Sequence, residues 1–129
     1  MGRSLLIMGA VSGMLCVILG AFGAHGLENQ LPAQHLEWWR KAVDYQALHS
    51  LALLVVGLLA LQQGSRLLQW SGWSFLIGIL LFSGSLYLLA LTGNRTLGMI
   101  TPFGGLAFIT GWCCLTLAAW RLPNRPRQY

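Results

Sequence analysis

The sequence predicts an all-α integral membrane protein, a four-helix bundle that crosses the bilayer up-down-up-down. Charged residues make up only 9% of the chain, far below the roughly 25% of soluble domains, so a water-soluble fold is excluded. Four long apolar stretches each approach the roughly 20 residues that a helix needs to cross a hydrocarbon core of about 30 Å. They are Leu5–Ala24, Tyr45–Leu61, Trp70–Leu91 and Leu97–Trp120.

We expect one transmembrane domain over residues 1–129. The first apolar stretch is longer than the roughly 7–15 residues of a signal peptide core, so it is expected to remain as a helix. The only long connection follows it. Nothing interrupts helical periodicity from Ala33 onward, and the segment 33–41 is expected to lie along the membrane surface or to extend the second helix. The predicted helices cover about 4–25, 42–63, 70–92 and 97–121.

Glycine and proline positions predict how the helices pack. Gly9 and Gly13 form a GxxxG pair, which lets another helix approach closely, either from this chain or from a second protein. The other connections are short, so consecutive helices are antiparallel neighbours. Pro102, followed by Gly104 and Gly105, predicts a kinked or partly unwound start of the fourth helix, because proline removes an amide donor and clashes with the preceding turn.

Basic residues predict that both termini face the cytoplasm. Cytoplasmic loops of membrane proteins carry an excess of arginine and lysine, and five such residues lie at the end with the termini against three at the other. The first group is Arg3, Arg66, Arg121, Arg125 and Arg127, and the second is Arg40, Lys41 and Arg95. The net charge of +5 therefore indicates topology rather than nucleic-acid binding, because no basic cluster lies beside exposed aromatics in a soluble fold.

Tryptophans mark both membrane interfaces, where amphipathic indole rings prefer to lie. Trp112 lies inside the fourth stretch and is expected to pack against other helices. The interface residues are Trp38 and Trp39 on the outer side, and Trp70, Trp73 and Trp120 on the inner side.

The polar residues within the predicted spans concentrate in their outer halves, which is where a site is expected. Polar groups are costly in lipid and usually face the bundle interior or a cavity. The sequence favours either a water-filled crevice or a fully packed polar network there. The candidate lining residues are His25, Tyr45, His49, Ser83, Ser85 and Tyr87. Possible ion pairs in the outer loops join Arg95 to Glu28 or Asp44.

His49 is the candidate with the clearest chemistry. It lies one turn below Tyr45 on the same helix face, and an imidazole buried there is expected to be neutral. Its expected partner is Tyr45, His25, Ser83 or Tyr87. A structural hydrogen bond, a small-molecule or proton site, and a metal or haem ligand all stay open as roles.

No catalytic set can be assigned. The chain lacks a GxSxG, HExxH, P-loop, Rossmann or kinase motif, so we expect neither a cofactor nor a metal centre. The cysteines lack metal-binding or disulfide spacing and are expected to act as small apolar residues within the spans. They are Cys16, Cys113 and Cys114.

Four motifs resemble domain-of-unknown-function family 423, whose members are small inner-membrane proteins related to the transmembrane protein 256 group. The motifs occur in the family's order over roughly residues 5–115. They are Gly20-Ala-Phe-Gly-Ala-His-Gly-Leu27, Tyr45-Gln-Ala-Leu-His49, Phe82-Ser-Gly-Ser-Leu-Tyr87 and Thr101-Pro-Phe-Gly-Gly105. The resemblance implies four membrane helices in a bacterial plasma membrane, and no activity.

The sequence thus favours a non-enzymatic scaffold or accessory protein of the bacterial inner membrane. The alternative is a small transporter, or a protein that binds a lipid, quinone or proton in its polar outer half. An enzyme, with or without a haem, ranks last. The expected partners are the lipid bilayer and either a second copy or another membrane protein, with no nucleic acid.

Overall fold

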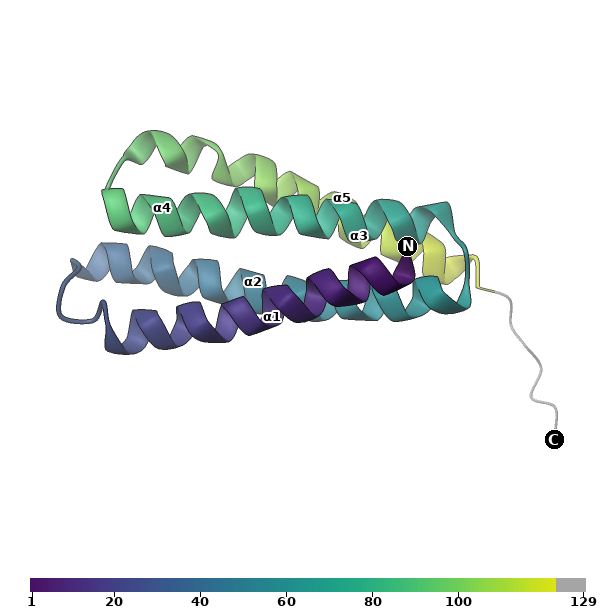
Figure 1. Cartoon of the computed structure of the whole chain (residues 1–129). Helices are drawn as coiled ribbons and strands as arrows, with labels where there is room; N and C mark the ends of the chain where they lie inside the picture. Colours follow the sequence, from purple (N-terminus) through teal and green to yellow (C-terminus); the bar gives the residue numbers. More distant parts are fainter. Residues whose placement is uncertain (123–129) are drawn as a thin grey trace.

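The structure is a computed structural model that describes residues 1–122, and all regular elements in that range are helices (Figure 1). Four helical rods are long and apolar enough to cross a membrane, which confirms the predicted all-α, four-helix membrane fold. Arg125 and Arg127 lie outside the described residues. The elements are α1 (Gly2–His25), α2 (Ala33–Gln62), α3 (Arg66–Gly78), a π-helical segment η1 (Ile79–Ser83), α4 (Gly84–Thr92), a 3-10 segment η2 (Arg95–Met99) and α5 (Thr101–Trp120).

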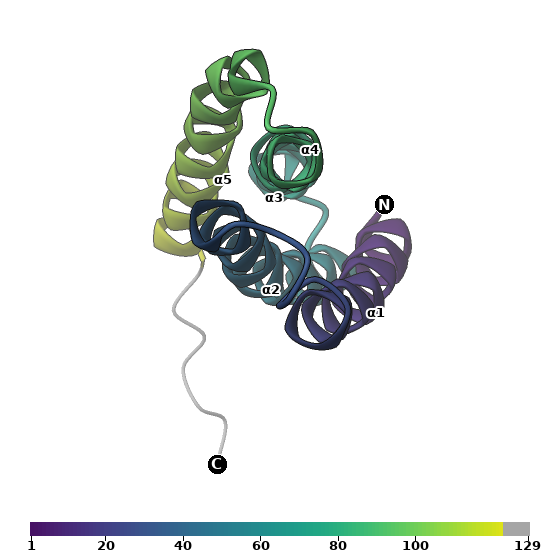
Figure 2. The ribbon, with the colours of Figure 1, turned by 90° about the vertical axis from the view of Figure 1, so that its left-hand side faces the viewer.

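Each rod packs mainly against its neighbour in the sequence (Figure 2). α1 packs along α2, α2 packs against the continuous rod formed by α3, η1 and α4, and this α3–α4 rod packs against α5. α1 touches α3 at very few positions. The helices are therefore closely packed where they are neighbours in the sequence. The other two helix pairs, α1 with the α3–α4 rod and α2 with α5, touch almost only through side chains.

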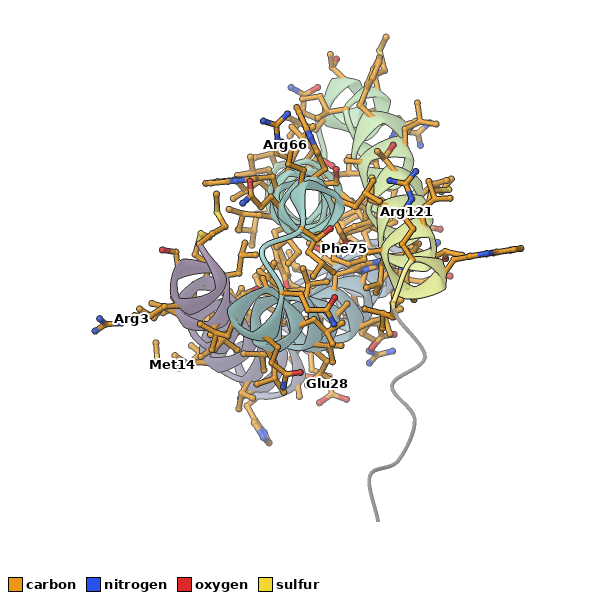
Figure 3. The ribbon with its side chains drawn as sticks, turned by 90° about the vertical axis from the view of Figure 1, so that its right-hand side faces the viewer. Arg3, Met14, Glu28, Arg66, Phe75 and Arg121 are labelled. Carbon is orange, nitrogen blue, oxygen red and sulfur yellow. The ribbon has the colours of Figure 1, made fainter. Side chains whose placement is uncertain are left out.

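The apolar core lies where α1, α2, α3 and α5 meet. Phe75, Leu5 and Leu53 are fully buried there, and Phe108 of α5 packs against the same cluster. Figure 3 shows Phe75 pointing into the space between the helices, whereas Arg3 points away from the bundle. Burial of large side chains thus holds the inner half of the bundle together.

α2 contains the segment 33–41, which agrees with the second of the two expectations, that this segment extends the second helix. It begins at Ala33 and runs unbroken to Gln62, so the chain has no separate interfacial element there. Trp39 explains the continuity, because its ring is 3% exposed and its Nε1 donates a 2.9 Å hydrogen bond to the Leu19 carbonyl of α1. A buried, bonded indole fixes this turn of α2 against α1.

The start of the fourth rod is partly unwound, as predicted, but the irregular backbone precedes Pro102. Pro102 lies in the first turn of α5, where its missing N–H would have had no helical partner, so proline is tolerated at no cost. The irregular backbone comes earlier, in η2 and a turn at Ile100. The third rod carries an irregularity of its own, the π-helical η1, which the sequence did not indicate.

Glycines allow close packing inside the chain. A methyl group at Gly9 would lie 3.0 Å from the Leu54 side chain of α2, so half of the predicted GxxxG pair contacts a helix of this chain. A methyl at Gly13 would meet nothing within 4 Å. At the α5 contact, a methyl at Gly104 would overlap the backbone of Phe82.

Replacing Gly104 with alanine is therefore expected to destabilise the bundle. The added methyl would lie 2.7 Å from the Phe82 Cα, so α5 must move away from η1, at a cost of about 1–3 kcal/mol typical of overpacking. Gly105→Ala is the matched control, because its methyl would lie 4.0 Å from the Phe82 ring. Thermal unfolding of the purified proteins in detergent measures both, and equal stability of the two variants would contradict the packing.

Candidate functional site

One polar network joins α1, α2 and α4. The Tyr87 hydroxyl donates a 2.6 Å hydrogen bond to Gln46 Oε1, and Gln46 Nε2 donates a 3.0 Å bond to the Ser12 carbonyl. The Ser12 and Ser50 hydroxyls lie 2.7 Å apart and share a hydrogen bond. Gln46 is thus the centre of a chain of bonds that fixes three helices relative to one another.

His49 belongs to a second network that faces α5. Its Nδ1 lies 2.7 Å from the Tyr45 carbonyl of its own helix, and Trp112 Nε1 donates a 3.1 Å bond to its Nε2. An indole nitrogen can only donate and a carbonyl can only accept. The His49 ring is therefore neutral, with its proton on Nδ1.

Aromatic rings enclose His49. Its ring stacks on Phe108 with 3.5 Å between centroids and 8° between planes, and Phe75 and Trp112 lie 5.6 Å and 6.0 Å away. These rings fill the side of the bundle between α2 and α5. Tyr45, one of the predicted partners, accepts a hydrogen bond from His49 through its backbone carbonyl. Trp112, expected only to pack against other helices, also donates a hydrogen bond to His49.

The two candidate serines bond within the bundle. Ser83 Oγ donates a 2.7 Å bond to the Ala42 carbonyl of α2. Ser85 Oγ donates a 3.0 Å bond to the Phe82 carbonyl and lies 2.7 Å from Thr101 Oγ1. These bonds tie η1 to α2, and α4 to the start of α5.

The six candidate residues do not line one common cavity. Tyr87 belongs to the network toward α1 and His49 to the network toward α5. The Tyr45 ring stacks on Phe82 at 4.3 Å but is 41% exposed. His25 ends α1 with an exposed side chain and joins neither network within the described residues.

Of the three charged residues expected to form outer-loop ion pairs, two share a cavity and the third does not. Glu28 and Asp44 line a cavity of about 160 Å³ together with Arg40, where α1 ends and α2 begins, at the end of the bundle predicted to face outward. Arg95 lies in η2, is exposed, and is not among the residues that line this cavity. The basic residue that shares this cavity with the two carboxylates is therefore Arg40, for which the sequence indicated only a role in topology.

The largest of the described hollows is a groove of about 360 Å³ between α1 and the α3–α4 rod. Its walls are almost wholly apolar, and its few polar residues come from the network around Gln46. A methyl group at Gly84 would meet no neighbouring group within 4 Å, so this glycine opens onto the groove. The lining residues are Ile7, Met8, Val11, Ser12, Leu15, Leu19, Gln46, Leu76, Ile79, Leu80, Ser83, Gly84 and Tyr87.

The sequence reading missed this groove, because it searched for a site among polar residues near the outer surface. The groove instead spans the middle of α1, from Ile7 to Leu19. Ser12, a lone polar residue in an apolar stretch, was the available signal. Within residues 1–122 no three His, Cys, Asp or Glu side chains cluster as metal ligands would. The arrangement is suited to holding an apolar group.

His49 provides a test of this arrangement. Nitrogen-15 NMR of the purified protein should show a neutral ring protonated on Nδ1. Trp112→Phe removes the donor to Nε2 and should cost about 0.5–2 kcal/mol of unfolding free energy. Trp120→Phe, at a position 86% exposed, should cost almost nothing. A ring protonated on Nε2 would contradict the network.

Comparison with known proteins places the chain in a family. The model of the family described as "Protein of unknown function (DUF423)" matches residues 19–105. A "UPF0382 membrane protein" of Staphylococcus saprophyticus is 48% identical over 91% of this chain and 97% of its own length. The "UPF0382 inner membrane protein YgdD" of Escherichia coli K12 is 40% identical over 95% of this chain and 94% of its own. No solved structure matches. The chain therefore belongs to the DUF423 family of membrane proteins.

Proposed function

We propose that this protein is a non-enzymatic binding protein of the bacterial inner membrane, and that it holds the apolar chain of a membrane lipid in the groove between α1 and the α3–α4 rod. The observation that carries the proposal is the groove itself. It has about 360 Å³ of space, lies at mid-depth of the spans and has almost wholly apolar walls.

The dimensions of the groove suit a lipid chain. Its lining runs from Ile7 to Leu19 on α1, which is about 18 Å at 1.5 Å per residue. One leaflet of the hydrocarbon core is about 15 Å deep, half of the roughly 30 Å total. An empty groove would lack the dispersion contacts that its lining side chains can make. A lipid chain that fills the groove supplies these contacts and is therefore stabilised there.

The polar floor of the groove favours an apolar occupant. The Tyr87 hydroxyl donates to Gln46, the Gln46 amide donates to Ser12, and the Ser83 hydroxyl donates to a backbone carbonyl of α2. Throughout residues 1–122, no buried side-chain nitrogen or oxygen lacks a hydrogen-bond partner. An alkyl or isoprenoid chain therefore leaves every bond intact, and no buried polar side chain in that range requires a polar group from the occupant.

Binding is favoured over catalysis by the state of His49. Both of its ring nitrogens are engaged in hydrogen bonds, and Phe108 covers one ring face. A general base must reach the proton that it removes, and this imidazole has no free nitrogen to offer.

The relatives and the charges support the proposed location. The Escherichia coli relative is named an inner membrane protein, which supports the same membrane for this chain. Arg3, Arg66 and Arg121 belong to the end of the bundle where α1 begins and α5 ends (Figure 1). Arg125 and Arg127 follow α5 in the sequence, and the resulting five basic residues, against three at the other end, support a cytoplasmic position for both termini.

The second candidate function is an accessory subunit that packs against another membrane protein or a second copy. The open space at Gly13 favours it, because small residues on exposed helix faces let a second helix approach. α1 also contacts little besides α2, so much of its surface is free for such a contact.

A groove-filling substitution tests the lipid-binding proposal. Gly84→Leu places a side chain in the groove, and its Cβ would meet no neighbouring group within 4 Å, so the bundle should fold while the space is lost. Labelling of the lining residues by a phospholipid with a photoreactive acyl chain should fall several-fold.

Gly13→Leu is the matched control for that experiment. It adds the same side chain at an open helix position that does not line the groove, so labelling of the groove should persist. Uniform labelling around the whole bundle, or equal labelling in Gly84→Leu and the unmodified protein, would refute lipid binding in this groove.

Reporter fusions test the orientation. A green fluorescent protein fused after Tyr129 should fluoresce, because it folds in the cytoplasm. Alkaline phosphatase at the same position should be inactive, because it folds only in the periplasm. The reverse pair of results would place the termini outside.

A further inference from the structure

We propose that the cavity at the outer end of α1 and α2 binds the head group of a zwitterionic phospholipid that carries a primary ammonium. Arg40 would bind the phosphate, while Glu28 and Asp44 would bind the ammonium. The cavity has about 160 Å³ of space and shares no lining residue with the apolar groove. The inference therefore stands independently of the proposed function.

The cavity is built by close packing of the two helices. Trp39 forms its buried wall, held by the bond from its indole to the Leu19 carbonyl. Gly23 lies directly against the Trp39 ring, where a methyl group would clash with it. The small residues Gly20 and Ala24 complete the α1 side of the cavity, so the hollow exists because large side chains are missing there.

The length of α2 places the cavity at the head-group level. α2 has 30 residues, so it is about 45 Å long and exceeds a hydrocarbon core of about 30 Å. Counting about 20 residues back from Gln62 puts the edge of the core near Asp44. Arg40 lies one turn farther out and Glu28 lies beyond the end of α1, within the head-group layer.

The charges match a zwitterion rather than an anion. Two carboxylates and one guanidinium give the cavity a formal charge of −1, so an anionic head group is repelled overall. A guanidinium binds phosphate oxygens with two parallel hydrogen bonds. A primary ammonium has three donors, which two carboxylates can accept. Asp44, at the edge of the hydrocarbon core, gains most from such a cation, since an uncompensated charge is costly there.

Native mass spectrometry of the full chain tests this assignment. The protein is released from detergent after mixing with equal amounts of phosphatidylethanolamine and phosphatidylglycerol of identical acyl chains. The unmodified protein should retain the ethanolamine lipid in preference, by about tenfold if one charge-assisted hydrogen bond decides the difference. Equal retention of both lipids would overturn the proposal.

Charge-matched variants locate the site. Glu28→Gln combined with Asp44→Asn should abolish the preference, and Arg40→Gln should weaken retention of the ethanolamine lipid. Glu37→Gln and Lys41→Gln change the same charges at exposed positions that do not line the cavity, so both should behave like the unmodified protein. All these side chains are exposed, so unfolding temperatures should not change. Equal effects of the cavity variants and their controls would refute the site.

Two further measurements distinguish a lipid from a soluble head group, and this cavity from the apolar groove. Soluble phosphoethanolamine at the same concentration should not bind, because it lacks the chains that hold a lipid at the bundle surface. Binding of soluble phosphoethanolamine without any lipid adduct would overturn the lipid as its source. Gly84→Leu should leave the head-group preference unchanged, so a failure of the groove and a failure of this cavity are distinguishable.

Discussion

The structure depends on one constraint, that polar groups surrounded by hydrocarbon must find their partners within the protein. No buried side-chain nitrogen or oxygen lacks a partner within residues 1–122. Gln46 satisfies this constraint across three helices, since it binds Tyr87 of α4 and Ser12 of α1. Sliding either helix by one turn along α2 would break these bonds. Polar pairing therefore fixes the register, while glycines determine how closely the helices approach.

The same constraint explains why the contact between α2 and α5 differs from the contact between α1 and the α3–α4 rod. Between α2 and α5 the space is filled by His49, Trp112 and Phe108, where Trp112 donates a hydrogen bond to His49 and Phe108 stacks on the His49 ring. Between α1 and the α3–α4 rod, Gly84 contributes no side chain to the lining. The polar atoms on this side bond to one another at the floor, and the space above them remains as the groove.

The sequence predicted the four spans because apolar length is a local property. It left open whether the segment 33–41 extends the second helix, because the burial of Trp39 that fixes this segment requires the space that Gly23 leaves on another helix. The local rule for proline predicted an irregular start of the fourth rod but not its position, since the irregular backbone lies just before Pro102. Nor could it pair Trp112 with His49, 63 residues away, since that contact depends on the rotation of α5. Polarity alone grouped His25 with residues that the fold separates.

The satisfied floor of the groove also determines where lipid recognition can occur. A groove whose polar atoms are already bonded discriminates by shape and apolar contact, and many lipid tails meet those requirements equally. Discrimination between lipids needs groups that are free to bind, and at the outer end of α1 and α2 the exposed side chains of Glu28, Arg40 and Asp44 line one cavity. Their long or flexible side chains remain in the polar layer, where water satisfies them until a head group replaces it. We therefore expect this bundle to hold a lipid chain in the groove and to select the lipid head group at the cavity, at a different depth.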